Sequence, residues 1–449
     1  MLILPNISTL IAWLALTASL LASLALGANR PVTWVLVSGL LLFLLIAQTI
    51  SRRGATTPPI GLPALLYLGV LAWSLFQATP DLAPMAWHHP VWEAMPTLSG
   101  VSEVGPAISA DPIATLHGVL RLSGYGALFV LIVFAARDED RALAMLRVVA
   151  LFSAGLAVYG LYCRFVGVNP LLGEEAGRGG ALSASFVNRN HYATFAAFGV
   201  IANLAAVMVA VAAGQAGAGR RQNLRSLLEG FAGGGWIYVL GFMLCLGAVV
   251  LTMSRGGGAA LLVGLTTFAL LYRRRRDWGS LVLMVLLVGI LALVALTISE
   301  GLMARLLTTS EEGLRFVVYP EVLDQALERP WLGHGLGAFH EVFRAHVPLE
   351  AARAGEWNFA HNTWLENLHD LGAPAALALW LSVGIIVAKC FQQARAWAYR
   401  RTLPAAAVSV AAIAGTHSLV DFSMQIPACV YLFVILLGLG WAQSLPRQS

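Results

Sequence analysis

Long apolar segments alternate with short polar loops along almost the whole chain. A helix needs about 20 mainly apolar residues to cross the hydrocarbon core of a bilayer. The pattern therefore predicts an all-α polytopic membrane protein, with about twelve transmembrane helices in a single domain over residues 1–449. We place these helices at 7–27, 32–50, 61–78, 116–136, 142–166, 190–213, 236–253, 257–272, 278–298, 364–388, 404–419 and 426–443.

The polar loops are of two kinds. Arginine clusters without histidine mark every second loop, at 51–54, 137–147, 220–225, 273–276 and 389–401. An excess of Lys and Arg in short loops marks the cytoplasmic side, and an even number of spans places both termini there. The opposite side carries all ten histidines: His88, His89, His117, His191, His334, His340, His346, His361, His369 and His417. We therefore expect the histidine-bearing side, and with it the chemistry, to face the periplasm or cell exterior.

Composition excludes an ordinary soluble protein. The chain is 58% hydrophobic and 11% charged, whereas about a quarter of the residues in soluble proteins are charged. The net charge of +5 comes from the separate arginine-rich loops, and no aromatic-interleaved basic stripe indicates nucleic-acid binding. Four scattered cysteines have no metal-binding or redox spacing and are expected to pack as small apolar residues. The first apolar segment lacks a positive n-region, which favours an uncleaved first span over a signal peptide.

The longest outer loop, 299–363, lies between the ninth and tenth predicted spans. Its segment 311–328 has the spacing of a helix, and the glycine-rich run Pro330-Trp-Leu-Gly-His-Gly-Leu-Gly337 ends it. The apolar positions that set this period are Leu314, Val317, Val318, Val322, Leu323, Ala326 and Leu327. Another outer loop, 79–115, is rich in Pro, Trp and Ser, and is interpreted as a lid or spacer at the membrane surface.

Two arginines on the outer side are candidates for binding phosphate. Arg255 stands in Ser254-Arg255-Gly-Gly-Gly258, at a tight turn between two spans. An arginine beside a glycine-rich turn suits a bidentate phosphate contact, although an arginine at a span end also commonly extends to the interface. Arg315 lies on the helical segment of the long loop. Its alternative is a solvated helix face paired with Glu311.

His361 and Asn362 lie where the long loop re-enters the membrane. A neutral imidazole takes a proton from a hydroxyl near neutral pH, and Glu366 is five residues further on. The alternative is a structural histidine, with Asn362 or Thr363 capping the following helix.

Two more polar groups flank spans on the outer side. The run Asn188-Arg189-Asn190-His191 opens a span and suits an anion site at a helix N-terminus, or else a cap with an interfacial charge. His417 and Asp421 are four residues apart and could pair across one helical turn.

The Asp138-Glu-Asp140 sequence has the form of a metal–nucleotide-sugar motif. It lies on the cytoplasmic side between Arg137 and Arg141, so we interpret it as a charged turn. No other acidic pair on the outer side has metal-ligand spacing, and no Walker A loop is present.

These outer residues resemble the O-antigen ligase family of bacterial membrane proteins, which includes polysaccharide polymerases and protein O-oligosaccharyltransferases. The family pattern has His-Asn, nine residues and then Gly, which fits His361-Asn362 and Gly372. The Ser254-Arg255-Gly256 turn and the run from Arg315 to Gly337 are also similar. Two positions depart from the pattern: Tyr319 stands where a Leu is usual, and Ala375 stands where Gly, Thr or Tyr is usual. The similarity covers roughly residues 180–430.

The resemblance implies a bundle of about a dozen helices, with the long loop closing over a lateral opening. It implies transfer of a glycan from a polyprenyl-diphosphate carrier to a hydroxyl of lipid A-core, glycan or protein, with no metal or nucleotide cofactor. Arg255 and Arg315 would bind the diphosphate, and His361 would lie at the acceptor hydroxyl. Fixed guanidiniums can stabilise the charge of a leaving diphosphate in a site with little water. One base without a clear carboxylate nucleophile favours direct displacement with inversion.

Two other classes of membrane protein are alternatives to the transferase. A transporter or flippase would place charged groups at mid-membrane and show repeats or broken helices. The polar residues gather on one side here and no internal repeat is found, which favours the enzyme. A non-catalytic partner in an envelope assembly and a polymerase of the same family remain alternatives.

Overall fold

The protein is a bundle of long helices. A computed structural model describes residues 7–51, 60–94, 105–171, 174–175, 180–215, 231–272, 311–353, 355–396 and 401–446. In the bundle, the long helices are α1 (Ile7–Ala22), α2 (Pro31–Ser51), α3 (Leu62–Ala78), α5 (Pro112–Ala135), α6 (Glu139–Val166), α7 (Arg189–Gln215), α9 (Trp236–Leu251), α10 (Arg255–Tyr272), α16 (Ala373–Arg395), α17 (Thr402–His417) and α18 (Pro427–Ser444).

Shorter elements connect the long helices. They are η1 (Leu26–Ala28), η2 (Met85–Trp87), α4 (Val91–Ala94), η5 (Phe231–Gly235), α12 (Glu311–Glu328), α13 (Phe339–Phe343), α14 (Leu349–Ala352), α15 (Thr363–Leu371) and η6 (Ser423–Gln425). The described sheet is a two-residue antiparallel pair, β1 (Val168–Asn169) with β2 (Glu174–Glu175). The all-α prediction is confirmed.

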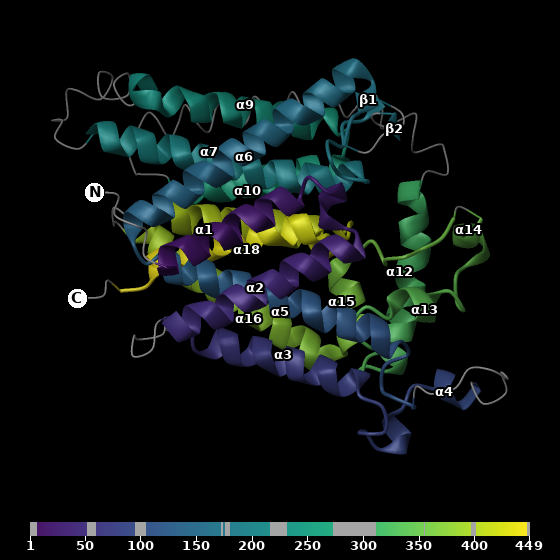
Figure 1. The fold of residues 1–449 in the computed structure, drawn as a ribbon. Coiled ribbons are helices and arrows are strands. Elements are labelled where there is room, and N and C mark those ends of the chain that lie inside the picture. The colour runs from purple at the N-terminus through teal and green to yellow at the C-terminus, as the bar shows by residue number, and fades with distance from the viewer. Residues whose placement is uncertain are drawn as a thin grey trace.

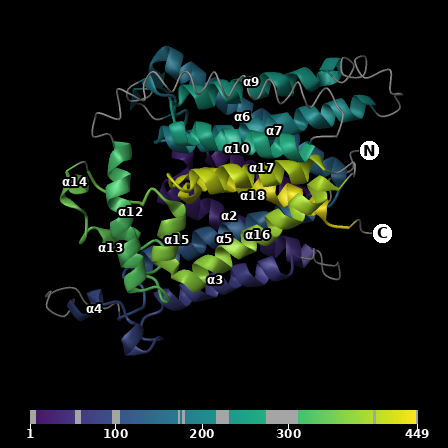
Figure 2. The ribbon, with the colours of Figure 1, turned by 180° about the vertical axis from the view of Figure 1, so that it is seen from behind.

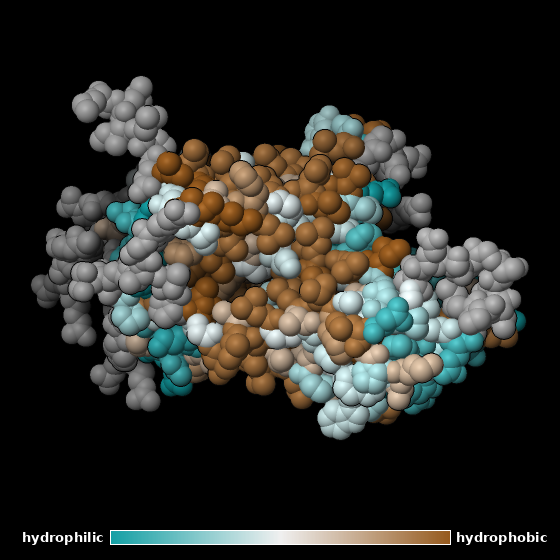
Figure 3. Space-filling view, turned by 60° about the horizontal axis from the view of Figure 1, so that its bottom comes forward, coloured by the Kyte–Doolittle hydropathy of each residue, from teal (hydrophilic) through white to brown (hydrophobic). Residues whose placement is uncertain are grey.

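Eleven of the twelve predicted spans correspond to described long helices. Eight of these are long and apolar enough to cross a membrane, and α1, α3 and α17 are shorter apolar helices. The predicted span at 278–298 and the arginine clusters at 220–225 and 273–276 lie outside the described residues. Apolar side chains cover the middle of the bundle, while hydrophilic ones gather toward its two ends (Figure 3). Helices suit this environment because they satisfy their own backbone hydrogen bonds in lipid.

The predicted span 364–388 is two helices and not one. α15 ends at Leu371 and α16 begins at Ala373, because Gly372 adopts a positive φ of 74° that a helix cannot continue through. Pro374 then stands in the first turn of α16, where its missing N–H costs nothing. Only α16 belongs to the candidate membrane-spanning set, because α15, with nine residues, is too short to cross a bilayer.

α18 forms the centre of the bundle and is buried along its whole length. It packs against α17, α5, α16 and α7, as Figure 2 shows from behind. Small residues also allow its neighbours to pack closely. α10 and α17 approach each other at Gly264, where an added Cβ would overlap the Ile413 side chain. Close backbone approach at small residues is the usual way in which helices associate in a membrane.

The two ends of the bundle differ in their elements. The start of α1 and the end of α18 lie at the same end of the bundle, which we call the terminal end (Figure 1). There the side chain of Arg141 donates to Thr9 (3.0 Å) and that of Arg137 donates to the Ala442 carbonyl (3.3 Å). Asp138 caps α6 by accepting from the Arg141 amide (2.9 Å), so the Asp138-Glu-Asp140 sequence forms the start of a helix.

The opposite end, called the loop end, carries α4 and α12 to α15 (Figure 1). Side chains tie its loops together. The Gln77 amide donates to the carbonyls of Leu332 (2.7 Å) and Asp370 (3.0 Å), and Arg329 donates to the Trp87 carbonyl (2.7 Å). The predicted lid or spacer at 79–115 is therefore fastened to the long loop over its described part.

The His89 and His334 rings form a hydrogen bond at the loop end whose donor and acceptor can be assigned. The Gln325 carbonyl can only accept a hydrogen bond, so the Nε2 of His334, 2.9 Å away, donates. The Nδ1 of neutral His334 then accepts from the Nε2 of His89 (2.9 Å). Burial lowers the pKa of each ring to about 3, so both stay neutral and the order of donors is fixed.

α12 spans Glu311–Glu328, the residues that the sequence pattern predicts. Its inner side carries the fully buried Val318 and Val322, which pack with Phe339 and Phe343 in a small separate core. Not all the apolar positions that set the helical period are buried: Leu323 and Leu327 are 42% and 59% exposed.

We predict that the loop end faces the periplasm and the terminal end the cytoplasm. His346→Cys and Arg395→Cys supply one thiol at each end, and the four native cysteines are buried. In cells with a permeabilised outer membrane, an impermeant maleimide should label His346→Cys at once and Arg395→Cys only after lysis. Unsubstituted protein is the control for background labelling. The opposite pattern would contradict the predicted orientation.

Candidate functional site

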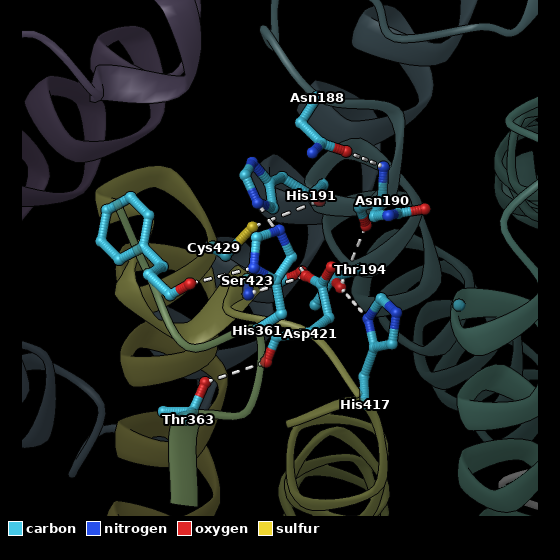
Figure 4. Close-up of polar contacts among 12 residues, drawn as sticks. Asn188, Asn190, His191, Thr194, His361, Thr363, His417, Asp421, Ser423 and Cys429 are labelled. Carbon is cyan, nitrogen blue, oxygen red and sulfur yellow. Dashed lines mark hydrogen bonds and ion pairs between the residues drawn. The ribbon is translucent and has the colours of Figure 1, made fainter. Parts of the chain in front are cut away.

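Four of the predicted site residues come together at the loop end, around the turn that joins α17 to α18. Figure 4 shows His191 from α7, His417 from the end of α17, Asp421 from the turn itself and His361 from the segment before α15. The Phe422 ring lies between two of the histidines, with centroid distances of 4.4 Å to His191 and 4.6 Å to His361. The site thus combines segments that are far apart in sequence.

Asp421 is a fully buried carboxylate at the centre of this group. Its Oδ1 accepts from the amide of Ser423 (2.9 Å) and from the Ser423 hydroxyl, and lies 3.9 Å from the Nε2 of His191. Burial raises the pKa of the Asp421 carboxyl. The His417 and His191 rings and the Ser423 hydrogen bonds lower this pKa by more than burial raises it. The pKa lies below the usual range, so Asp421 stays ionised.

His417 does not pair with Asp421 across a helical turn, as the spacing suggested. α17 ends at His417, and the His417 Nδ1 lies 2.6 Å from the Thr194 hydroxyl of α7. The ring packs against Gly256, where an added Cβ would lie 3.0 Å from Nε2. Gly256 is therefore needed for helix packing, and it brings the start of α10 against this histidine.

The His361 ring has a defined tautomer. Its Nδ1 lies 3.0 Å from the Phe359 carbonyl, which can only accept, so Nδ1 carries the proton and Nε2 keeps its lone pair. Burial, together with the nearby Arg315 charge, lowers the pKa of His361 to about 4. The ring is therefore a neutral base near pH 7.

His361 sits in a backbone conformation that its neighbours hold in place. Its φ is +55°, a left-handed value that is uncommon for a residue with a side chain. The Glu366 Oε2 accepts from the amide of Ala360 (2.7 Å), and the Tyr319 hydroxyl donates to the His361 carbonyl (2.9 Å). Asn362 caps α15 by accepting from the Leu365 amide (3.1 Å). These contacts fix the ring relative to the bundle.

Two residues that the sequence predicted to bind substrate, Asn362 and Glu366, instead make hydrogen bonds that hold the local backbone. Asn362 takes the capping role that was its alternative interpretation. Glu366 is 3% exposed, and burial, with the neighbouring Asp370 carboxyl, raises its pKa to about 8. Both act on the turn that carries His361.

Arg315 reaches the same turn from α12. Its Nη1 donates to the Val420 carbonyl, next to Asp421 in the chain. The Glu311 side chain considered from the sequence lies outside the described part of the structure. Arg255 is the first residue of α10 and is partly exposed. It precedes Gly256, the residue in contact with His417.

The segment Asn188–His191 forms the start of α7 beside this group. The Asn188 side chain accepts from the Asn190 amide (2.8 Å), so its oxygen closes the turn into the helix. Arg189 and Asn190 are partly exposed. His191 is buried, and its carbonyl accepts from the Cys429 thiol (3.3 Å).

Sequence reasoning missed four contributors: Thr194, Tyr319, Phe422 and Ser423. Tyr319 follows Arg315 by four residues, so a helix places both on one side, and this spacing was a usable signal. Thr194 likewise follows Asn190 by four residues. The aromatic packing of Phe422 between His191 and His361 depends on tertiary contacts that no local pattern encodes.

Among the described residues, no group of three or more His, Cys, Asp or Glu side chains is placed to hold a metal ion.

Comparison with known proteins finds one family. The sequence model described as O-antigen ligase matches residues 240–380, a region that contains Arg255, Arg315 and His361. No curated protein matches the chain.

Proposed function

We propose that this chain transfers a saccharide from a polyprenyl-diphosphate carrier to an acceptor hydroxyl at the periplasmic face, because its residues 240–380 match the O-antigen ligase family model. The family match supports a membrane glycosyltransferase of the ligase or polymerase type. The finer proposal rests mainly on one observation: within the matched domain, a neutral histidine with an available Nε2 and an arginine converge on the turn beside Asp421.

The lipid diphosphate is assigned to the two arginines. A carrier lipid keeps its chain in the bilayer and its diphosphate at the surface, which is the level of the loop end. A planar guanidinium forms paired hydrogen bonds with phosphate oxygens. Arg315 already donates one hydrogen bond to a neutral carbonyl, which leaves other N–H groups of its fork for an anion. Arg255 approaches from α10.

The proposed step is a single displacement. The acceptor oxygen attacks the anomeric carbon as its proton passes to the Nε2 of His361, and the bond from the anomeric carbon to the diphosphate oxygen breaks with both electrons going to that oxygen. The new negative charge on the diphosphate is stabilised by Arg255 and Arg315. One attack on one carbon inverts the anomeric configuration, so a donor of known anomer should give the opposite linkage.

The remaining polar groups have supporting roles in this proposal. The Asp421 carboxylate, 3.9 Å from the Nε2 of His191, orients that ring and balances the positive charge of the arginines. Asn188, Arg189 and Asn190 line the approach at the start of α7. The acceptor is a hydroxyl of lipid A-core, of another glycan or of a protein.

We expect Arg255→Ala and Arg315→Ala to abolish transfer while the protein still accumulates in the membrane. Arg255→Lys should retain little activity, because an ammonium cannot reproduce a bidentate phosphate contact. Transfer is measured with reconstituted protein, undecaprenyl-diphosphate oligosaccharide and acceptor, in EDTA throughout. Arg344→Ala is the matched control, since Arg344 lies on the same loop, is exposed and pairs with Glu341. Wild-type activity in Arg255→Ala would refute the phosphate assignment.

His361→Ala should lower the rate of transfer by about 10²–10⁴-fold, the usual contribution of a general base. Donor binding should change little, because the arginines carry that charge. His346→Ala is the matched control and should stay active. If His361→Ala were as active as wild type, His361 would have a structural role only.

The pH profile tests the same role in another way. A base works above its pKa and is lost as the pH falls through it, so the acidic limb of kcat/KM should lie near pH 4, below the ordinary histidine value of about 6.5. The diphosphate charge favours protonated His361, so the limb of kcat should lie at higher pH. A limb of kcat/KM at or above 6.5 would argue against a buried His361 as the base.

Tyr319 is expected to position His361 through the backbone. Tyr319→Phe removes only the hydroxyl that donates to the His361 carbonyl, a hydrogen bond of roughly 1 kcal/mol. We expect kcat to fall about fivefold while the donor KM and the unfolding temperature stay unchanged. Tyr162→Phe, on an exposed face of α6, is the control. An equal change in KM, or unchanged kcat, would rule out this role.

A further inference from the structure

α12 exposes an apolar stripe that the packing of the loop end does not use. Phe316, Pro320, Leu323 and Leu327 recur every three or four residues, so they share one side of the helix. Phe316 is 70% exposed and Leu327 is 59% exposed. Trp331, just beyond the helix, is 72% exposed. An exposed apolar row of this length marks a contact surface.

The stripe is distinct from the other sides of α12. The buried side, with Val318, Val322 and Ala326, faces the small core of the loop end. The charged side carries the exposed Asp324 and Glu328. The stripe lies between this charged side and the edge that carries Arg315 and Tyr319, and the Phe316 ring contacts the Tyr319 ring (6.0 Å). The apolar stripe therefore borders the candidate site.

α12 lies across the loop end, so all its residues are at a similar height along the axes of the long helices. Its axis runs across the ends of the long helices, in both Figure 1 and Figure 2. Its C-terminal end is fastened to the start of α16: the Ala373 amide donates to the Pro330 carbonyl (2.7 Å), and an added Cβ at Gly372 would lie 2.7 Å from the Trp331 carbonyl. α12 thus lies where the span α16 leaves the bilayer.

The stripe continues the lipid-facing surface of the spans. α16 is long and apolar enough to cross a membrane. Its Leu377 and Leu381 are 51% and 56% exposed, and exposed apolar side chains on a membrane span face lipid. Trp331 lies above them at the start of α16, a position typical of interfacial tryptophans. Leu327 lies at the end of α12, four residues before Trp331. A helix that lies along the interface with its apolar side toward the acyl chains has this arrangement.

We infer that α12 is an interfacial helix whose stripe, from Phe316 to Leu327, contacts the lipids of the outer leaflet. Bilayer lipid is the occupant because the stripe joins a surface already in contact with it. The contact holds α12, and with it Arg315, at the level of the lipid headgroups. This inference does not depend on the proposed reaction, and it holds for the protein without donor.

Site-directed spin labelling tests the lipid contact. Nitroxides are placed on the stripe by Phe316→Cys, Leu323→Cys and Leu327→Cys, and on the charged side by the matched controls Asp324→Cys and Glu328→Cys. All five positions are exposed, so the labels should not disturb packing, and the native cysteines are buried. The protein is placed singly in nanodiscs of phosphatidylethanolamine and phosphatidylglycerol. Collisions with oxygen, which partitions into lipid, are compared with collisions with a water-soluble nickel chelate.

Labels on the stripe should show a several-fold higher ratio of oxygen to nickel collisions than the controls, without any donor. Equal ratios at Leu323→Cys and Asp324→Cys would overturn the inference. Shielding from nickel that appears only after addition of undecaprenyl diphosphate would also overturn it, because the stripe would then belong to the donor lipid. Shielding in crowded liposomes but not in single-copy nanodiscs would overturn it in favour of a second copy.

Discussion

Hydrocarbon offers no partner for an unpaired backbone group, and this constraint confines the polar chemistry of the chain to the ends of its helices. Around the turn after α17, the histidines of the candidate site lie where helices start or stop, whereas Arg315 and Tyr319 come from within α12. His191 is in the first turn of α7, and His417 is the last residue of α17. His361 precedes the capped start of α15. The helix ends supply both the hydrogen-bonding groups and the rigid supports.

The charges at this turn complement one another. Asp421 stays ionised because histidine rings and Ser423 surround it, whereas burial and Arg315 keep His361 neutral. A neutral base beside fixed cations suits a reaction in which a proton is taken up and a diphosphate leaves. The carboxyl of Glu366, with its raised pKa, is used to hold the backbone before His361. Two buried acidic groups within a few residues of the site thus have different protonation preferences, because only Asp421 has cationic and hydrogen-bonding neighbours that outweigh burial.

Much of this architecture follows from local patterns. The apolar period predicts the described spans and α12 with its observed bounds, because length and periodicity are local properties. The break at Gly372 was missed, since the apolar run continues through it and only its backbone conformation interrupts the helix. The partners of Arg315 and His417 were also missed. They are a carbonyl and a hydroxyl about one hundred and two hundred residues away in sequence, and spacing within one segment cannot reveal them. The exposed stripe of α12 has the same helical period as its buried side, so the pattern alone could not say which apolar residues are buried.

The central claim is that a lipid diphosphate binds between Arg255, Arg315 and His361 at the loop end. Photo-crosslinking tests it without knowledge of the sugar or the acceptor. An undecaprenyl diphosphate with a diazirine next to the diphosphate is irradiated with the reconstituted protein, and the modified peptides are identified by mass spectrometry. The account predicts modification of α12 near Arg315, of the segment around His361 and of the turn after His417, with loss of all three in Arg255→Ala. Modification confined to the terminal end, or unchanged in Arg255→Ala, would contradict it.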